Sequence, residues 1–231
     1  MTDLFLIHGL KYSGKSTLAE RLMERYGYVR VKLADPLKNM VRSLLRDAGI
    51  ASDMIERYVE GDLKEAAIAE LGGTSSRRLM MTLGDEWRNM HGHMLWANIA
   101  ASKVEKLLSE GKKVVVDDVR YPFELERMTA FSPFTCAITR GTMHFEPYGE
   151  DRHPGERPMP VSRFDFHFRN DFATKDELWD VLDLVLEANG DYRRRLGEIS
   201  ELQGGQKASE NAVPEPHVLA GSQVFRPGVG G

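Results

Sequence analysis

The feature that most constrains the fold of this chain is a glycine-rich segment close to its start, residues 9–17. It reads Gly-Leu-Lys-Tyr-Ser-Gly-Lys-Ser-Thr and fits the pattern G-x-x-x-x-G-K-[ST]. A short apolar run, residues 4–7, precedes it, and residues 16–26 follow it with apolar side chains at helical spacing. A strand, a glycine loop and a helix in this order are the context in which the pattern binds phosphate. We call residues 9–17 the phosphate loop.

The chemistry expected of the phosphate loop follows from its backbone and two of its side chains. Its N–H groups can converge on phosphate oxygens, and the positive end of the following helix dipole adds to the attraction. Lys15 should reach the β- and γ-phosphates of ATP, and the Ser16 hydroxyl should bind Mg²⁺. ATP and Mg²⁺ are therefore the predicted cofactors; the alternative is a plain glycine turn before a helix. The candidate nucleotide-binding residues are Gly9, Lys11, Ser13, Gly14, Lys15, Ser16 and Thr17.

Strand and helix patterns alternate along most of the remaining chain. Asp35 is the expected N-cap of a helix that has Pro36 in its first turn, and Thr74 or Ser75 should open another helix through Leu83. Strands are expected at residues 29–33, 113–118 and 135–139, and further helices at residues 52–72, 94–109 and 175–187. This alternation predicts an α/β fold of the three-layer P-loop NTPase type, a parallel sheet flanked by helices.

One domain is expected over residues 1–202, because a chain of 231 residues with 42% apolar residues can bury a core of its own. Residues 141–170 are rich in arginine and proline and lack periodicity, which predicts an arginine-rich lid insertion. Arg152 is its candidate catalytic residue, since lid arginines can stabilise a phosphoryl group in transfer. The alternative is a flexible basic loop that takes no part in catalysis. Residues 203–231, rich in glycine and proline, are expected to be a disordered tail.

Two acids and several arginines complete the candidate site. Residues 113–118 read Lys-Val-Val-Val-Asp-Asp, and a carboxylate at the end of such a strand is where a phosphate-binding sheet organises its magnesium. Strand alternation lets only one of Asp117 and Asp118 face the metal, and the sequence does not say which, so both are candidates. The alternative is that the two acids merely end the strand. Arg42, Arg78 and Arg120 are candidates for holding a phosphate on the acceptor, or else solvated surface charges.

Composition narrows the class of partners. Lys and Arg total 31 against 35 Asp and Glu, a net charge of −4, which argues against duplex DNA as a partner. The single cysteine, Cys136, excludes an intrachain disulfide and a cysteine-built zinc site. Neither a secretory leader nor an apolar run of membrane-spanning length is present, so no membrane partner and a cytoplasmic location are expected.

Several separated segments together resemble the deoxynucleoside monophosphate kinases typical of tailed phages. Besides the phosphate loop they are residues 33–38 (Leu-Ala-Asp-Pro-Leu-Lys), 78–87 (Arg-Leu-Met-Met-Thr-Leu-Gly-Asp-Glu-Trp) and 116–124 (Val-Asp-Asp-Val-Arg-Tyr-Pro-Phe-Glu). A looser match, residues 153–156, reads His-Pro-Gly-Glu where the family has His-x-Ser-Glu, and Asn170-Asp171 follows it.

The resemblance implies ATP- and Mg²⁺-dependent transfer of a phosphoryl group to a deoxynucleoside 5′-monophosphate, for phage DNA precursor synthesis in the host cytoplasm. A homodimer is compatible with it. Asp118 matches the acid of the family's Asp-x-Arg segment, with Asp117 as an extra neighbour. The candidate catalytic residues are Lys15, Asp118, Arg120 and Arg152. The candidate acceptor-binding residues are Asp35, Lys38, Arg42, Arg78, Glu86, Trp87, Arg120, Glu124 and Glu156.

Two other functions stay open at this point. A P-loop kinase could phosphorylate a hydroxymethylated base in DNA, such as hydroxymethyluracil; this alcohol acceptor would need a carboxylate base, which Asp35 or Asp117 could supply. The chain could instead be a binding module that ATP opens and closes. In the leading interpretation the acceptor phosphate attacks in line, without a covalent enzyme intermediate, and catalysis is positioning and charge neutralisation.

Overall fold

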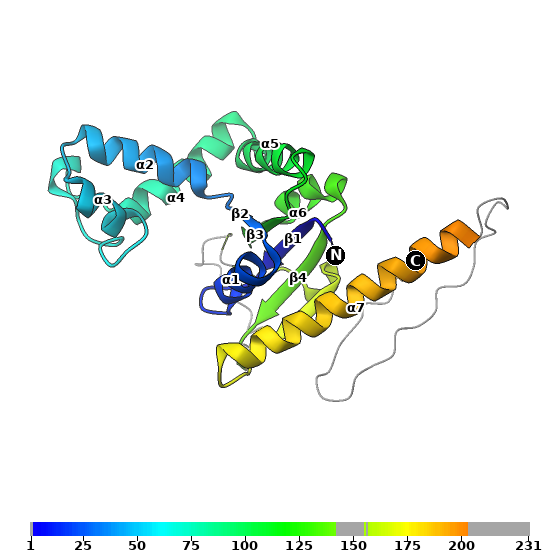
Figure 1. The fold of residues 1–231 in the computed structure, drawn as a ribbon. Coiled ribbons are helices and arrows are strands. Elements are labelled where there is room, and N and C mark those ends of the chain that lie inside the picture. Colours follow the sequence, from blue (N-terminus) through cyan, green and yellow to red (C-terminus); the bar gives the residue numbers. More distant parts are fainter. Residues whose placement is uncertain (1, 142–154, 156, 203–231) are drawn as a thin grey trace. The chain divides into compact units, whose positions relative to one another are not determined.

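The computed structural model describes residues 2–141, 155 and 157–202, and in it the chain forms two compact units (Figure 1). The sheet unit comprises Met1–Arg30, Lys112–Arg120 and Ser132–Gly231. The helical unit comprises Val31–Gly111 and Tyr121–Phe131. None of the described helices combines the length and apolar composition that crossing a bilayer requires.

The sheet has five strands in the order β2-β3-β1-β4-β5. Strand β1 lies in the middle and pairs in parallel with β3 and with β4, and β4 pairs in parallel with β5. Parallel neighbours that are distant in sequence require crossover connections, and these include helices. The predicted α/β class, a parallel sheet flanked by helices, is confirmed. The strands are β1 (Leu4–His8), β2 (Val29–Val31), β3 (Val114–Val119), β4 (Phe134–Thr139) and β5 (Phe166–Arg169).

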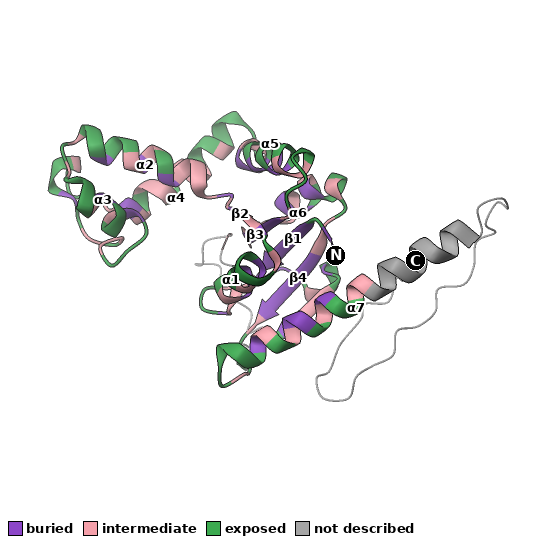
Figure 2. Ribbon diagram, in the orientation of Figure 1, coloured by how far each residue is buried: buried purple, intermediate pink, exposed green. Residues whose placement is uncertain are grey.

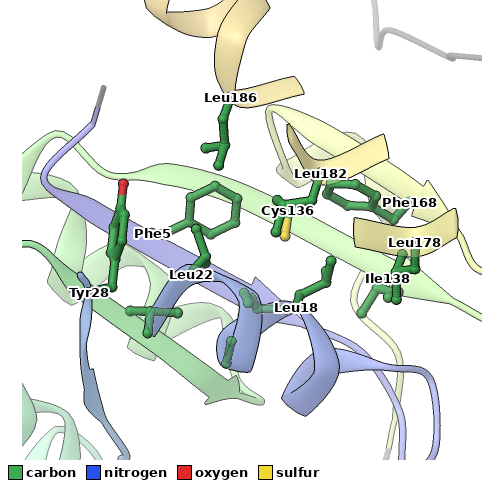
Figure 3. Packing of buried hydrophobic residues seen from close by; sticks show 13 residues of the cluster. Phe5, Leu18, Leu22, Tyr28, Cys136, Ile138, Phe168, Leu178, Leu182 and Leu186 are labelled. Carbon is green, nitrogen blue, oxygen red and sulfur yellow. The ribbon is translucent and has the colours of Figure 1, made fainter. Parts of the chain in front are cut away.

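Two helices of the sheet unit, α1 (Lys15–Tyr26) and α7 (Lys175–Leu202), share one hydrophobic core with the sheet (Figure 3). Leu18 and Leu22 from α1 and Leu182 from α7 lie in the same cluster as Phe5 and Cys136 from the strands. All five strand positions of β1 are buried, as expected for a central parallel strand (Figure 2). The start of α1 is thereby fixed directly after β1, which places the phosphate loop at the end of the central strand.

The helical unit has its own small core, built from Val41, Leu45, Ile55, Val59 and Ile68. Its α-helices are α2 (Asp35–Asp47), α3 (Ser52–Val59), α4 (Ser76–His91), α5 (Leu95–Ser109) and α6 (Pro122–Met128), and its 3₁₀ turns are η1 (Ala69–Leu71) and η2 (Thr129–Phe131).

Local signals in the sequence locate some element ends correctly and miss others. The Ser75 side chain accepts a hydrogen bond from the Arg78 backbone N–H, which confirms it as the N-cap of α4. Asp35 is not an N-cap: it is the first residue of α2, and the cap position is Ala34, whose side chain makes no capping bond. The helix expected over residues 52–72 ends at Val59, and the chain then turns, with η1 near its end.

The sequence pattern misses helix α6 and strand β5, and β5 lies where no regular structure was expected. It lies inside residues 141–170, the segment expected to be a lid without regular structure, and is preceded there by η4 (Val161–Arg163). Its four residues alternate Phe166, His167, Phe168 and Arg169, too short a pattern to stand out among prolines and arginines. Residues 142–154 and 156 of the expected lid, and the tail from residue 203 onwards, lie outside the described residues.

Candidate nucleotide-binding site

Two glycines of the phosphate loop are needed for different reasons. A Cβ on Gly9 would lie 2.5 Å from the Ile138 backbone oxygen and 2.6 Å from the Ser13 Oγ, so only glycine allows this close approach. Gly14 has φ +108°, a conformation that side chains rarely adopt, and a Cβ there would lie 2.5 Å from Asn170 Nδ2. The glycines therefore let the loop fold back against β4 and the residue after β5.

Asn170 holds the phosphate loop in place. This residue is buried; its Nδ2 donates a hydrogen bond to the Ser13 backbone oxygen at 2.8 Å, and its own backbone N–H donates to the Thr139 oxygen at 2.7 Å. In a trans peptide the C=O and the next N–H point in opposite directions. Because the Ser13 oxygen points to Asn170, the Gly14 N–H points away from it. Sequence analysis did not assign Asn170 a role, although Asn170-Asp171 belongs to the looser match.

Lys15 lies at the start of α1 with its ammonium turned to the loop. Its Nζ donates a hydrogen bond to the Leu10 backbone oxygen at 2.6 Å. The pKa of Lys15 is lowered to about 8, mainly by burial and also by the charge of Arg120, while the charges of Asp117 and Asp118 act in the opposite direction. Asp117, Asp118 and Arg120, which are also candidate site residues, are therefore close enough to Lys15 to influence it electrostatically.

Arg30 joins two of the predicted metal-binding side chains, and sequence analysis did not single it out. Its Nε donates to Asp117 Oδ1 at 2.8 Å, and its Nη2 donates to Asp117 Oδ2 and, at 3.2 Å, to Ser16 Oγ. The Asp117 side chain is only 3% exposed and that of Arg30 20%. Burial alone would lower the pKa of Arg30, but the hydrogen bonds and charge of Asp117 raise it overall.

The two adjacent acids sit at an irregularity in β3. Leu6 pairs with Val116 and His8 pairs with Val119, so β3 has one more residue than β1 over this stretch. Such bulges change the direction in which neighbouring side chains point. Asp117 is buried and bonded to Arg30, beside the Ser16 hydroxyl, whereas Asp118 is half-buried. Of the two acids, Asp117 is the one that the described contacts connect to Ser16.

His8 links the end of β1 to the segment that leads into β5. Its Nδ1 lies 2.8 Å from the Val119 backbone oxygen, and its Nε2 accepts a hydrogen bond from the Met159 N–H at 3.0 Å. The ring stacks on Phe164. Burial lowers the pKa of His8 and the charge of Lys15 acts in the same direction, against the bond to Val119. The imidazole is therefore neutral, with its proton on Nδ1.

Several predicted acceptor-side residues of the helical unit make contacts within that unit. Lys38, which is buried, forms an ion pair with Glu60 at 2.5 Å, and Arg42 binds Glu56 with two hydrogen bonds of 2.7 and 3.0 Å. Glu124, also buried, accepts a hydrogen bond at 3.0 Å from the Tyr121 backbone N–H at the start of α6. An acceptor phosphate at Lys38 or Arg42 would have to compete with the carboxylates of Glu60 and Glu56.

The predicted acceptor-side residues Asp35, Arg78, Glu86 and Trp87 are more accessible. Asp35 lies 3.5 Å from the Lys103 ammonium. Arg78, Glu86 and Trp87 lie on α4 and are exposed, and the Trp87 ring, 40% exposed, stacks on buried Trp96 at 6.2 Å between centroids. Arg152 and Glu156 lie outside the described residues. None of these contacts tests whether the residues bind an acceptor, so their assignment stays a prediction.

The side chains around the phosphate loop suit Mg²⁺ better than a softer metal. The described residues contain no cluster of three or more His, Cys, Asp or Glu side chains that could hold a metal ion. Mg²⁺ does not need one, because it takes one or two protein oxygens together with nucleotide phosphates and water. The Ser16 hydroxyl and the Asp117 carboxylate, joined by Arg30, are oxygen donors of this kind.

Comparison with known proteins places this site in a family. A family model for an AAA domain matches residues 4–119, half of the chain, and this stretch runs from β1 through the phosphate loop to the end of β3. The chain belongs to the AAA domain family. The AAA domain match includes Lys15, Ser16 and both acids of β3, whereas Arg120 lies just beyond its end.

Solved structures that are similar to this chain share little sequence with it and superpose only in part. Shikimate kinase from Aquifex aeolicus is 18% identical, with a TM-score of 0.36 over 81% of this chain and 98% of that one. Dephospho-CoA kinase from Campylobacter jejuni is 14% identical, with a TM-score of 0.41 over 83% of this chain and 100% of that one. At these values the likeness decides neither the reaction nor the substrate. No curated protein sequence matches the chain significantly.

Proposed function

We propose that the protein is a phosphotransferase that moves the γ-phosphoryl group of ATP to the phosphate of a deoxynucleoside 5′-monophosphate. The observation that carries the proposal is the phosphate loop between β1 and α1, with Lys15 within electrostatic reach of Asp117, Asp118 and Arg120. Two carboxylates, a lysine and an arginine around one loop suit a triphosphate and its metal. The deoxynucleotide acceptor rests on the sequence resemblance.

In the proposed reaction an oxygen of the acceptor phosphate forms a bond to the γ-phosphorus. The bond from that phosphorus to the bridging oxygen of ADP breaks, so the products are ADP and a nucleoside diphosphate. Lys15 exchanges its bond to the Leu10 oxygen for the donor phosphates, and Arg120 adds positive charge nearby. Ser16 and Asp117 would hold Mg²⁺, which neutralises phosphate charge when bound. A phosphate acceptor needs no strong general base.

The alternative acceptor, a hydroxymethyl group on a DNA base, is less well supported. An alcohol needs a carboxylate to take its proton. Both oxygens of Asp117 are bound by Arg30, and Asp35 lies beside the Lys103 ammonium, so neither suggested base is well placed to accept a proton.

The decisive assay measures ADP release with a panel of nucleoside and deoxynucleoside monophosphates, and with DNA that contains hydroxymethyluracil. We expect diphosphate formation from one or a few deoxynucleotides. Lys15→Ala should lower turnover by about 100-fold or more without a comparable loss of melting temperature, because it removes a charge that contacts phosphate. Lys106→Ala, an exposed lysine on α5, is the matched control and should retain full activity.

Each other outcome of the panel contradicts a stated part of the proposal. Phosphoryl transfer to DNA alone would show that the acceptor is the hydroxymethyl group of a base and not a nucleotide phosphate. ATP binding without transfer to any acceptor would favour an ATP-controlled binding module. Full activity of Lys15→Ala would refute the assignment of the donor site.

A further inference from the structure

A protein cation joins the two side chains that are expected to bind the metal. Arg30, on β2, spans from the Asp117 carboxylate on β3 to the Ser16 hydroxyl at the start of α1. It uses both oxygens of Asp117 and also reaches the hydroxyl oxygen of Ser16. These are the oxygens that Mg²⁺ would take from the protein, so the guanidinium and the metal have the same protein partners.

The guanidinium is a strong competitor for these oxygens. It is permanently charged, and its planar fork matches a carboxylate with two parallel hydrogen bonds. The pair is largely shielded from water, since the Asp117 side chain is 3% exposed. Mg²⁺ held by Asp117 and Ser16 would bring a second positive charge to oxygens that already accept hydrogen bonds from the guanidinium, so the two cations would compete for them.

We propose that Arg30 is a positioning residue that competes with Mg²⁺ for Asp117 and Ser16, and so sets how strongly the metal tightens nucleotide binding. The metal gains its protein ligands only when the guanidinium gives up at least one of its bonds. Without the metal, Arg30 keeps the Asp117 carboxylate directed toward the phosphate loop and compensates its buried charge. This inference rests on the donor half of the proposed function, namely nucleotide binding at the phosphate loop, and is independent of the acceptor.

The test is the affinity for a fluorescent ADP analogue, N-methylanthraniloyl-ADP, measured once with EDTA and once with saturating Mg²⁺. The ratio of the two dissociation constants reports how far the metal strengthens binding. In Arg30→Gln, which removes the competing charge, we expect this ratio to rise about tenfold or more, the scale of one charge-assisted hydrogen bond. The Mg²⁺ concentration at half-maximal binding should fall by a similar factor.

Two further variants separate competition from a general effect on folding. Arg30→Lys keeps the charge but cannot form the fork, so its ratio should lie between wild type and Arg30→Gln. If Arg30→Gln does not fold, the ratio measured for Arg30→Lys still tests whether Arg30 competes with Mg²⁺. Arg25→Gln is the matched control: Arg25 lies on α1 in the same unit, pairs with Asp183 at 2.8 Å, and should leave the ratio unchanged.

The outcomes distinguish this inference from the proposed function. An unchanged or smaller ratio in both Arg30 variants, with normal melting temperatures, would mean that Arg30 serves the metal site or only joins β2 to β3, and the inference would be wrong. Failure of the wild-type protein to bind the analogue with either EDTA or Mg²⁺ would instead refute the donor site, and this inference with it. Binding without any acceptor activity would leave the inference about Arg30 intact.

Discussion

Replacing Gly14 by alanine tests whether the phosphate loop is held as the structure shows. The backbone at Gly14 has φ +108° and ψ 9°, outside the regions that residues with a Cβ readily occupy. The added Cβ would lie 2.5 Å from Asn170 Nδ2 and 3.1 Å from Ile138 Cδ1. A Cβ and a nitrogen cannot remain at 2.5 Å, so the Asn170 amide has to move away from the Ser13 oxygen.

The cost of Gly14→Ala has two parts. Holding alanine in this backbone conformation costs about 1–3 kcal/mol. Losing the buried hydrogen bond between Asn170 and Ser13 costs about 1–3 kcal/mol more. The free energy of unfolding should therefore fall by about 4 kcal/mol, equivalent to a fall in melting temperature of about 10 °C for a folded chain of this size.

Gly27→Ala is the matched control for the backbone part. Gly27 follows α1 in the same unit, has φ +71°, and has nothing within 4 Å of an added Cβ. It should cost only about 1 kcal/mol, because it carries the left-handed conformation without the clash. The smaller number of unfolded conformations of alanine affects both variants equally and cancels in the comparison.

Thermal and urea unfolding of both variants, with and without Asn170→Ala, measure the two parts separately. Asn170→Ala should cost less in the Gly14→Ala background than in wild type, since the hydrogen bond it removes is already broken there. Equal costs of Gly14→Ala and Gly27→Ala, together with additive effects of Asn170→Ala, would refute the loop geometry described above.

Two further predictions concern pH. The pKa of Lys15 is lowered to about 8, and a bound phosphate raises it because it binds the charged form. The dissociation constant of N-methylanthraniloyl-ADP should therefore be flat between about pH 7 and 8, where the phosphate of the analogue is ionised, and rise by up to about tenfold per pH unit above this range. Lys15→Ala should lack this rise, and a wild-type affinity that stays level to about pH 10 would contradict the prediction. Asp183→Asn should lower the free energy of unfolding at pH 7 by about 1–3 kcal/mol, since it weakens bonds from Arg21 and Tyr26. Burial raises the pKa of Asp183, but the bonds from Arg21 and Tyr26 outweigh this effect and lower the pKa overall. In urea unfolding, the free energies of unfolding of wild type and Asp183→Asn should therefore converge as the pH falls through this lowered pKa. A difference that stays constant with pH would refute the ionic contribution.

Local sequence patterns predicted those parts of the fold that depend on neighbouring residues. The turn of residues 9–17 between a strand and a helix, α1 itself and the Ser75 cap of α4 each follow from signals within a few positions, and the structure confirms these elements. Strand β5 was missed because what makes it a strand is its pairing with β4, thirty residues earlier in the chain, rather than its own four residues. Asp35 was misplaced by one position, because an aspartate suits the first turn of a helix as well as its cap.

The roles of Arg30 and Asp117 show where pattern reasoning stops. In the sequence Val29-Arg30-Val31 the arginine looks like a solvent-facing residue of a short edge strand, a common way to protect a sheet edge. Its actual partner lies 87 residues away and depends on how β2 is placed beside β3. Because side chains alternate along a strand, Asp117 and Asp118 are expected to point in different directions. The extra residue in β3 disturbs this alternation, so counting along the strand does not tell which of the two acids enters the site. The chemistry of two adjacent acids is therefore set by strand register and by one arginine on a neighbouring strand, and neither can be read from the motif that contains the acids.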